Sequence, residues 1–453
     1  MLKRIRPVFA VAAETRDVLV VDPTPGSTVV VQPFAVWRAV ASCFDRNAAG
    51  APFLASLVFS SHMSGIRVAM VSPLCRRVMD PRAAVFFTIL IVAASAVFAG
   101  RVQQKMRDFE VYWTAGARVA ASESLYREGD GHYRFKYLPA FAVAVSPLAQ
   151  LPLATAKAVW FALSVACLVG FIALSVQCVP RPAISTGWLT AFTVVTMAKF
   201  YGHELVLGQA NLVFGVVCAV ALSALLRGRA AGAGFAFGAA SIVKPYAVVF
   251  VPYLLLTRNW VAALGACVAL ACVSALPIPF YGFGGNLQLL SDWWSTASGT
   301  SVPLLTNADS SSVFAMFAKW LGWGTAASVL SLVTVIVLGC AFLLMIAKRR
   351  GVQSPEALEL GLLLTFIPLC TPQGWDYVLL LSTPLVALLI ARVPSMPRID
   401  RWVAVATLAV IAFSLYDVMG RAAYRAFMAL SIITVCYLVL TVLSVRLRLR
   451  GDA

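Results

Sequence analysis

Two charged residues are placed where they could do chemistry. Asp108 follows the first clean apolar run, 83–99, after a short polar stretch. A carboxylate at such a point can take a proton from a hydroxyl group near the membrane surface, which is general-base catalysis. Lys244 interrupts a later apolar stretch, 230–256. A lysine there is costly to bury and by default functional, and its ammonium group can bind a phosphate as a point charge.

Each assignment has a structural alternative. Asp108 could cap the start of a helix, or it could pair with Arg107 or Arg118. Lys244 could extend its ammonium group to the membrane interface, or it could pair with an acidic residue such as Asp376.

The residues around Asp108 are expected to form an amphipathic helix at the membrane surface. Within 108–121, apolar residues recur at helical spacing: Phe109, Trp113, Ala117 and Ala120. On such a helix Glu110, the nearest rival carboxylate, points about 200° away from Asp108. Only one of the two can face a given substrate, and we expect Glu110 to be a surface residue.

The composition places these residues in a membrane protein. Of the 453 residues, 61% are hydrophobic and only 12% are charged. Soluble domains average about 45–50% apolar and about 25% charged residues, so this charge could not cover a globular surface. A soluble multidomain protein, a disordered chain and a nucleic-acid binder of ordinary composition are excluded. The net charge of +17 is explained first by Lys/Arg-rich cytoplasmic connections.

Apolar runs that could cross a bilayer recur along the chain. They lie at 83–99, 155–179, 184–200, 206–226, 259–280, 324–347, 357–370, 376–392, 401–417 and 424–445. The two halves of 230–256 are each too short to span, and Lys244-Pro245 separates them, which predicts a broken or re-entrant hairpin. The expected fold class is an all-α polytopic membrane protein with about ten full transmembrane helices plus one hairpin.

Basic residues assign the two sides of the membrane. If 230–256 enters and returns, the short basic connections all fall on one side, which is the cytoplasmic side. Both termini are then cytoplasmic in a plasma or inner membrane, and the outer face receives two long loops, 101–137 and 281–323. Three regions are expected: a poorly ordered cytoplasmic extension or mis-assigned start at 1–79, a transmembrane domain at 80–446, and a cytoplasmic tail at 447–453.

No metal or other cofactor is indicated by the sequence. Eight of the ten cysteines lie in or beside apolar runs, and no Cys-x-x-Cys occurs, so we interpret them as small core residues. His62, His132 and His203 are too scattered for a metal triad, and no paired acidic motif appears. His203-Glu204 is expected on the outer face, where a solvated loop end is favoured and use as a ligand or in acid/base chemistry is the alternative.

Several short motifs occur in an order that resembles glycosyltransferase family 87, in the GT-C class of membrane enzymes that use polyprenyl-phosphate sugars. The motifs are Asp108-Phe109-Glu110-Val111-Tyr112-Trp113, Leu125-Tyr126, Phe135-Lys136-Tyr137-Leu138-Pro139, Gly208-Gln209-Ala210-Asn211, Lys244-Pro245, Asn307 to Ser311, and Thr371-Pro372-Gln373-Gly374-Trp375-Asp376-Tyr377. Each motif alone is weak, whereas the common order and membrane position are more specific. Residues 1–79 lie outside the resemblance.

The resemblance implies a GT-C-like bundle with a site on its outer face. Asp108 matches the essential carboxylate of that class, so it is the expected general base of an inverting transfer. Lys244, Lys136 and Arg107 are expected to bind the donor's phosphate or lipid. The sugar or acceptor is expected to contact Tyr137, Gln209, Asn211, Asn307, Trp375 and Asp376. Many relatives carry a histidine where this chain has Asp376-Tyr377; if that histidine contacts the donor phosphate, another group must do so here.

Two function classes follow from these observations. The leading one is an enzyme that moves mannose or another hexose or pentose from a polyprenyl phosphate to a lipid or glycan acceptor. The alternative is a transporter or flippase of a lipid-linked or anionic substrate that uses the broken helix at Lys244. No second copy of the Asp108 loop or of the broken segment is visible in the sequence, which favours the enzyme; a non-catalytic scaffold is a third possibility. Membrane lipids are the other expected partners, and nucleic acid is not expected.

Overall fold

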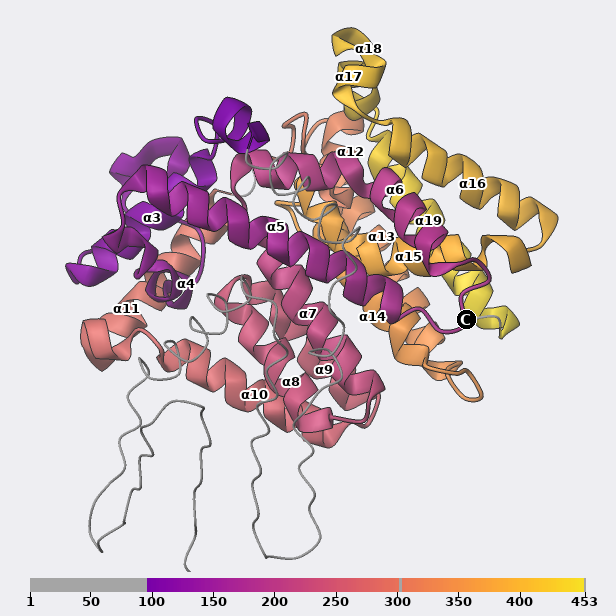
Figure 1. Ribbon diagram of the computed structural model, residues 1–453, viewed down its shortest axis with the longest axis horizontal. Helices are drawn as coiled ribbons and strands as arrows, with labels where there is room; N and C mark the ends of the chain where they lie inside the picture. Colours follow the sequence, from indigo (N-terminus) through magenta and orange to yellow (C-terminus); the bar gives the residue numbers. More distant parts are fainter. Residues whose placement is uncertain (1–95, 301–303, 452–453) are drawn as a thin grey trace, which may run out of the picture. The chain divides into compact units, whose positions relative to one another are not determined.

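The described residues of this protein are almost entirely helical. The computed structural model describes residues 96–300 and 304–451 (Figure 1). The extension expected at 1–79 and most of the expected span at 83–99 lie outside the described residues. Within them, the only pairing of β type is an isolated bridge between Ser310 and Trp375. An all-α fold is therefore confirmed for the described part of the chain.

Four helical stretches are long and apolar enough to cross a membrane. They are α5 (Leu153–Gln177), α13 (Thr325–Ala347), the stretch Asp376–Ser395 and α19 (Ile432–Arg450). A fifth candidate joins α10 (Trp260–Ala275) to α11 (Ile278–Gly299) across a bend of 95°. These helices support a multi-pass membrane protein, while the count of about ten full spans stays a prediction.

Other helices coincide with expected spans but are shorter or less apolar. They are α6 (Thr186–Leu207), α7 (Asn211–Leu226), α14 (Pro355–Cys370) and α16 (Arg398–Phe413). The candidate span Asp376–Ser395 consists of η9 (Asp376–Ser382), α15 (Thr383–Arg392) and a short 3-10 turn. The last expected run, 424–445, is divided, because Ser431 has a φ of 54° between α18 (Arg421–Ala429) and α19. A left-handed residue ends a helix, so one span cannot run through this position.

The stretch 230–256 is broken at Lys244. Its first half is α8 (Ala230–Ala239) with the 3-10 turn η6 (Ala240–Ile242), and its second half is η7 (Pro245–Val249) with α9 (Phe250–Leu256). Lys244 itself is extended, with φ −141° and ψ 130°. Proline after it disfavours helix at this residue, so the break follows from the sequence Lys244-Pro245.

Two glycines show that the broken stretch turns back on itself. Gly234 and Gly238 pack so closely on α10 that an added Cβ would lie 1.9 Å from the Ala262 oxygen and 2.3 Å from the Ala266 oxygen. Glycine permits this close approach of two backbones. The start of α8 thus lies beside the start of α10, and α9 ends just before α10 begins. Both ends of the stretch lie at one end of α10, with the break at Lys244 between them.

The segment 101–137, which the sequence assigns to the outer face, contains the expected helix, α3 (Arg107–Ala120), but a different face of this helix is buried. The buried side chains include Phe109, Tyr112, Ala115 and Val119, whereas Ala120 is exposed. The reason is Tyr112, whose ring lies edge-on to Phe141 of α4 (Pro139–Val145) and to Trp160 of α5. Figure 1 shows α3, α4 and α11 gathered at one end of the described chain.

The second outer segment, expected as a loop at 281–323, is largely helical. It holds most of α11 and all of α12 (Val313–Leu321). Gly282, with φ 69°, makes a kink within α11. The large side chains of Phe283 and Trp294 are exposed, which is typical of a helix lying on a membrane rather than of a solvated loop.

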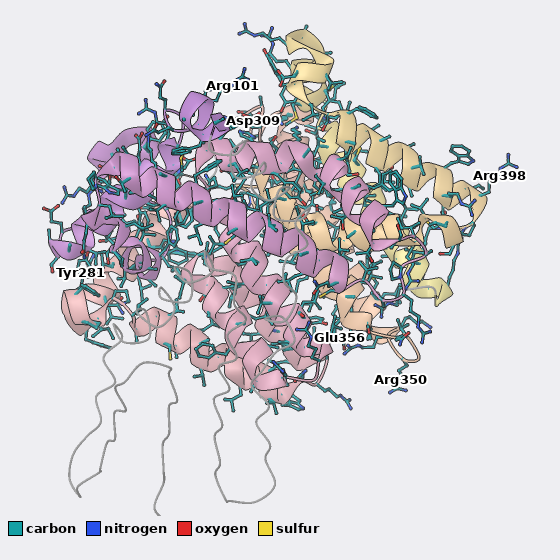
Figure 2. All side chains as sticks on the ribbon, in the orientation of Figure 1. Arg101, Tyr281, Asp309, Arg350, Glu356 and Arg398 are labelled. Atoms are coloured by element: carbon teal, nitrogen blue, oxygen red, sulfur yellow. The ribbon has the colours of Figure 1, made fainter. Side chains whose placement is uncertain are left out.

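Figure 2 separates the segments that the sequence assigns to opposite faces. Arg101, Tyr281 and Asp309 lie in the left half of this view, and Arg350, Glu356 and Arg398 lie in the right half. The first three belong to the expected outer segments or their edges. The last three belong to connections expected on the cytoplasmic side or to the helix that follows one.

Candidate active site

A cavity of about 540 Å³ lies where distant segments of the chain converge. Its volume is within the range of about 300–1,000 Å³ that small-molecule sites occupy. The lining residues are Arg107, Asp108, Val111, Tyr112, Tyr133, Arg134, Lys136, Tyr137, His203, Leu207, Gln209, Lys244, Pro245, Tyr246, Trp293, Ala297, Leu304, Asn307, Asp309, Thr371, Pro372, Gln373, Trp375, Tyr377 and Val378. The cavity therefore joins α3, the break at Lys244 and the two segments that precede α12 and η9.

Gln209 joins Asp108 to three tyrosines. Its Nε2 donates to Asp108 Oδ2 at 2.9 Å and to Tyr377 Oη at 3.1 Å. Its Oε1 accepts from Tyr112 Oη and from Tyr137 Oη, each at 2.9 Å. A glutamine amide has two donor hydrogens and two acceptor lone pairs, so all four are used. The amide orientation is thus fixed, and it holds the Asp108 carboxylate in one place.

Gly208 explains why Gln209 reaches Asp108. It ends α6 in the left-handed conformation, with φ 71° and ψ 35°. A Cβ at this position would lie 3.0 Å from side-chain atoms of Met106 and Phe109. Only glycine combines this backbone with so close an approach to α3. Trp160 Nε1 also donates to the Gly208 oxygen at 2.9 Å, which fixes the turn.

Lys244 reaches the same network from the broken stretch. Its Nζ donates to Tyr137 Oη at 2.9 Å and lies 4.2 Å from the centre of the Tyr137 ring. A cation over an aromatic face is stabilised by the ring's negative charge distribution. Tyr137 therefore links Lys244, through Gln209, to Asp108, so that residues from three distant motifs meet at one wall.

Cations outnumber carboxylates in the cavity lining. The cations are Arg107, Arg134, Lys136 and Lys244, and the carboxylates are Asp108 and Asp309. Burial and the neighbouring Arg134 lower the pKa of the Lys136 ammonium group, while Asp108 opposes them. The Nε atom of Arg134 is buried without a hydrogen-bond partner among the described residues. A lining with excess positive charge and a buried, unsatisfied donor is suited to an anion.

A second charged group lies behind the part of the cavity wall that His203 forms. Asp376 is fully buried, and its two oxygens lie 3.3 Å from Lys199 Nζ and 2.9 Å from His203 Nδ1. Lys199 is also buried, with its Nζ 4.9 Å from the centre of the Tyr424 ring. The alternative that Lys244 pairs with Asp376 is not what the structure has, because Lys199 and His203 occupy that carboxylate.

Backbone contacts attach the segment before α12 to the segment before η9. Ser311 N donates to Gly374 O at 2.6 Å, and Asp376 N donates to Asp309 O at 2.9 Å. This pairing brings the Asp309 side chain to the cavity. Burial and the nearby Asp376 raise the pKa of the Asp309 carboxyl, although His203 and two lysines oppose the shift.

The structure brings most of the predicted site residues to one cavity. Asp108, Arg107, Lys136, Tyr137, Gln209, Lys244, Asn307 and Trp375 line it. Two predicted residues, Asn211 and Asp376, are fully buried outside the lining. Asn211 Nδ2 donates to Glu204 Oε2 at 2.8 Å, so this amide supports the start of α7. Neither side chain lines the cavity.

Several lining residues were not predicted from the sequence. His203, expected to be a solvated loop end, lies in the wall with its side chain 30% exposed. Asp309, Tyr112 and Tyr377 were also not assigned to the site. His203 could have been found from its spacing, because it follows Lys199 by one helical turn in an apolar helix. Two polar residues on one face of such a helix are expected to face protein rather than lipid.

Glu110 faces away from the main cavity, as its helical position predicts. It pairs with Lys157 at 2.7 Å and with Arg107 at 3.1 Å. Burial alone would raise the pKa of the Glu110 carboxyl, but Lys157 and Arg107 outweigh burial and lower it. Glu110 instead lines a smaller neighbouring cavity of about 230 Å³.

No group of three or more His, Cys, Asp or Glu side chains that could hold a metal ion is found in the part of the chain that the structure describes. The cysteines in that part have free thiols. That the sequence indicates no required metal stays a prediction.

Comparison with known proteins gives one match. The family description of glycosyltransferase family 87 matches residues 135–372, just over half of the chain. The matched region includes Gln209, Lys244, Asn307 and the helices between them, while Asp108 and Trp375 lie just outside it. No curated protein and no solved structure matches the chain. Transport is not favoured by this match. The chain belongs to glycosyltransferase family 87 and is thus a membrane glycosyltransferase.

Proposed function

We propose that this protein transfers a sugar, mannose or another hexose or pentose, from a polyprenyl phosphate to a hydroxyl group of a lipid or glycan acceptor. The observation that carries the proposal is the meeting of Asp108 and Lys244 in one cavity, joined through Gln209 and Tyr137. A base and an anion-binding cation in one cavity are what this reaction needs.

Asp108 is the general base. Its carboxylate takes the proton of the acceptor hydroxyl while the hydroxyl oxygen attacks the anomeric carbon of the sugar. The bond between that carbon and the phosphate oxygen breaks, and its electron pair leaves with the polyprenyl phosphate. Attack from the side opposite the leaving group inverts the anomeric configuration. What supports this role is the hydrogen bond from Gln209, which holds the carboxylate at the cavity wall.

Lys244, Lys136 and Arg107 bind the phosphate. The leaving group gains negative charge as the bond breaks, so cations held beside it stabilise the transition state more than the bound substrate. Their side chains line the same cavity, in excess over the carboxylates. Lys244 is held by Tyr137 from one side, so its ammonium group keeps donor hydrogens for a ligand.

Aromatic and polar side chains bind the sugar or the acceptor. The rings of Trp375 and Tyr377 are nearly parallel, at 6°, and both line the cavity. Such rings can stack on the apolar face of a sugar, and Tyr137 and Asn307 are placed to contact hydroxyl groups. Asn211 and Asp376 contribute from behind the wall, by holding Glu204 and His203 respectively.

The cavity opens on the outer face of a plasma or inner membrane, with both termini in the cytoplasm. This orientation follows from the Lys/Arg-rich connections on the other side. Figure 2 supports it, because Asp309 of the cavity lies far from Arg350 of the basic triplet Lys348 to Arg350.

The purified protein in lipid nanodiscs tests the proposal. It is incubated with several polyprenyl-phosphate sugars and a membrane lipid extract as acceptor. Mass spectrometry then asks which donor is consumed and which lipid or glycan gains a hexose or a pentose. We expect one donor to be consumed with one new product. Consumption of no donor, beside an active control enzyme, would contradict the proposal.

A further inference from the structure

His203 is a cavity-facing imidazole held from behind by a buried carboxylate. Its Nδ1 lies 2.9 Å from Asp376 Oδ1, and its side chain is 30% exposed, whereas that of Asp376 is 0% exposed. The edge of its ring meets Tyr377, with the ring centres 5.3 Å apart. Because Nδ1 is engaged by the carboxylate, Nε2 is the nitrogen that can reach a ligand in the cavity.

Asp376 does not need His203 for charge compensation. Lys199 Nζ lies 3.3 Å from the second oxygen of Asp376 and is itself buried. One buried lysine already neutralises one buried aspartate, so a neutral residue at 203 would leave no unpaired charge. A histidine that serves only to satisfy a core carboxylate is usually enclosed, whereas this one reaches the cavity.

The charges around His203 nearly cancel without it. Lys199 and Lys319 are opposed by Asp376 and Asp309, which leaves a formal charge of zero. The remaining ionisable neighbours are Tyr377, Tyr424 and the buried Glu204, which faces Asn211 instead. Protonation of the imidazole therefore decides whether this wall is neutral or carries one positive charge.

We propose that His203, as an imidazolium, donates from Nε2 to a phosphate oxygen of the sugar donor, and that Asp376 and Lys199 are positioning residues that hold its ring. This inference rests on the proposed function. The imidazolium lines the same cavity as Lys244, so that both cations hold the same anion. Binding requires no proton transfer: the acceptor proton goes to Asp108, and the electron pair of the broken bond stays on the phosphate.

Binding of polyprenyl methyl phosphate, a phosphodiester whose single charge does not change between the two pH values used, tests the proposal in nanodiscs without catalysis. The affinity is measured at about pH 6 and about pH 8, on either side of the usual histidine pKa. The proteins are wild type, His203→Gln, Asp376→Asn and the control Asp400→Asn. Asp400 is also a buried carboxylate between two cations, Arg446 and Arg450, but it lies on a different helix, outside the cavity.

We expect wild type to bind several-fold more tightly at the lower pH. His203→Gln should bind about tenfold more weakly at the lower pH, the loss typical of a hydrogen bond to a charged group, and its affinity should change less between the two pH values than that of wild type. Asp376→Asn should retain weak binding with its pH dependence moved to lower pH, because the imidazolium loses its carboxylate. Asp400→Asn should behave as wild type.

Two results would overturn the role of His203: His203→Gln with wild-type affinity at both pH values, or wild type without binding. A parallel arm replaces the lipid by inorganic phosphate; an effect of His203→Gln there, with unchanged lipid binding, would also overturn it. If wild type binds the lipid but transfers no sugar, the proposed function fails while the binding comparison still decides the role of His203.

Discussion

Two groups of charged residues differ in how their charges are paired. The far cluster, defined as Arg349, Glu356, Glu359 and Arg448, joins each cation to a carboxylate. Arg448 Nη1 lies 3.0 Å from Glu359 Oε1, and both side chains are 0% exposed. Glu359 Oε2 also accepts from Tyr253 Oη at 3.0 Å. By contrast, Lys244 in the cavity donates to a tyrosine hydroxyl rather than to a carboxylate.

This difference separates a structural charge cluster from a binding site. In the far cluster, cations and carboxylates neutralise one another, so the pairs join α14 and α19 and offer nothing to a ligand. In the cavity, the cations that line it exceed the carboxylates. Excess charge of one sign in a cavity is what an ionic ligand of the opposite sign requires. Substitutions in the far cluster should therefore lower stability and leave binding unchanged. Substitutions of the cavity cations should lower ligand binding with little effect on stability.

The largest expected effect on stability is in the far cluster. Arg448→Met leaves the Glu359 carboxylate buried with only Arg349, at 3.5 Å, as a charged partner. Breaking a buried pair by removing one partner costs about 3–5 kcal/mol. We expect the free energy of unfolding to fall by that order in a denaturation series, with transfer per folded molecule unchanged. Arg450→Met, a half-exposed neighbour, should cost about 1 kcal/mol or less. Equal losses of unfolding free energy in Arg448→Met and Arg450→Met would contradict the stabilising role of the buried pair.

The next effect is on binding, in the cavity. Lys244→Met removes the ammonium group that reaches Tyr137 while keeping the length of the side chain. We expect donor affinity to fall by about 10–100-fold, the cost of losing a charged hydrogen-bonding partner. The midpoint of thermal unfolding should fall less than in Arg448→Met, because Lys244 donates to a hydroxyl group rather than to a carboxylate. Lys105→Met, at an exposed lysine of the segment 101–137, is the control. Unchanged affinity in Lys244→Met would show that Lys244 does not bind the donor.

The smallest expected effect is on the melting temperature, which should shift in opposite directions when two different carboxylates, Asp309 and Asp400, are neutralised. Burial and Asp376 raise the pKa of Asp309, so the folded protein binds more protons than the unfolded chain between the usual and the raised pKa. Stability therefore falls as pH rises through that window, and the loss persists at neutral pH. Asp309→Asn should raise the melting temperature by on the order of 1 °C at about pH 7 and leave it unchanged in acid.

Asp400→Asn is the matched variant from the paired region. Asp400 Oδ1 lies 3.0 Å from Arg446 Nη1, so loss of its charge should lower the melting temperature at neutral pH. Differential scanning fluorimetry of both variants at two pH values compares the signs. If the melting temperatures of both variants shift in the same direction, the ionised Asp309 carboxylate does not destabilise the folded protein.

The sequence predicted the positions of the apolar helices better than it predicted the structure of the segments between them. Apolar runs located α5, α13 and α14 within a few residues, because hydrophobicity depends on local composition. The break at Lys244 followed from proline, whose effect is also local. The helical nature of 281–299 was missed, because Gly-Gly and polar residues are typical of loops while the exposed Phe283 and Trp294 signal a surface helix.

The site was predicted in part, for a physical reason. Asp108 and Lys244 were found because a charge next to or within an apolar run is costly, and that cost is visible in sequence. The partners of Asp376 were not found, because they depend on packing between α6 and η9, far apart along the chain. Gln209 was expected at the site, but its use of all four hydrogen-bonding positions required the three-dimensional arrangement.

The most direct test is the rate of sugar transfer by Asp108→Asn in the nanodisc preparation used for wild type. Asparagine keeps the shape of the side chain and removes the proton acceptor. Loss of a general base costs about 10²–10⁴-fold in rate. We expect a loss of that size with unchanged donor affinity and melting temperature. Transfer by Asp108→Asn at the wild-type rate would contradict the assignment of Asp108 as the base.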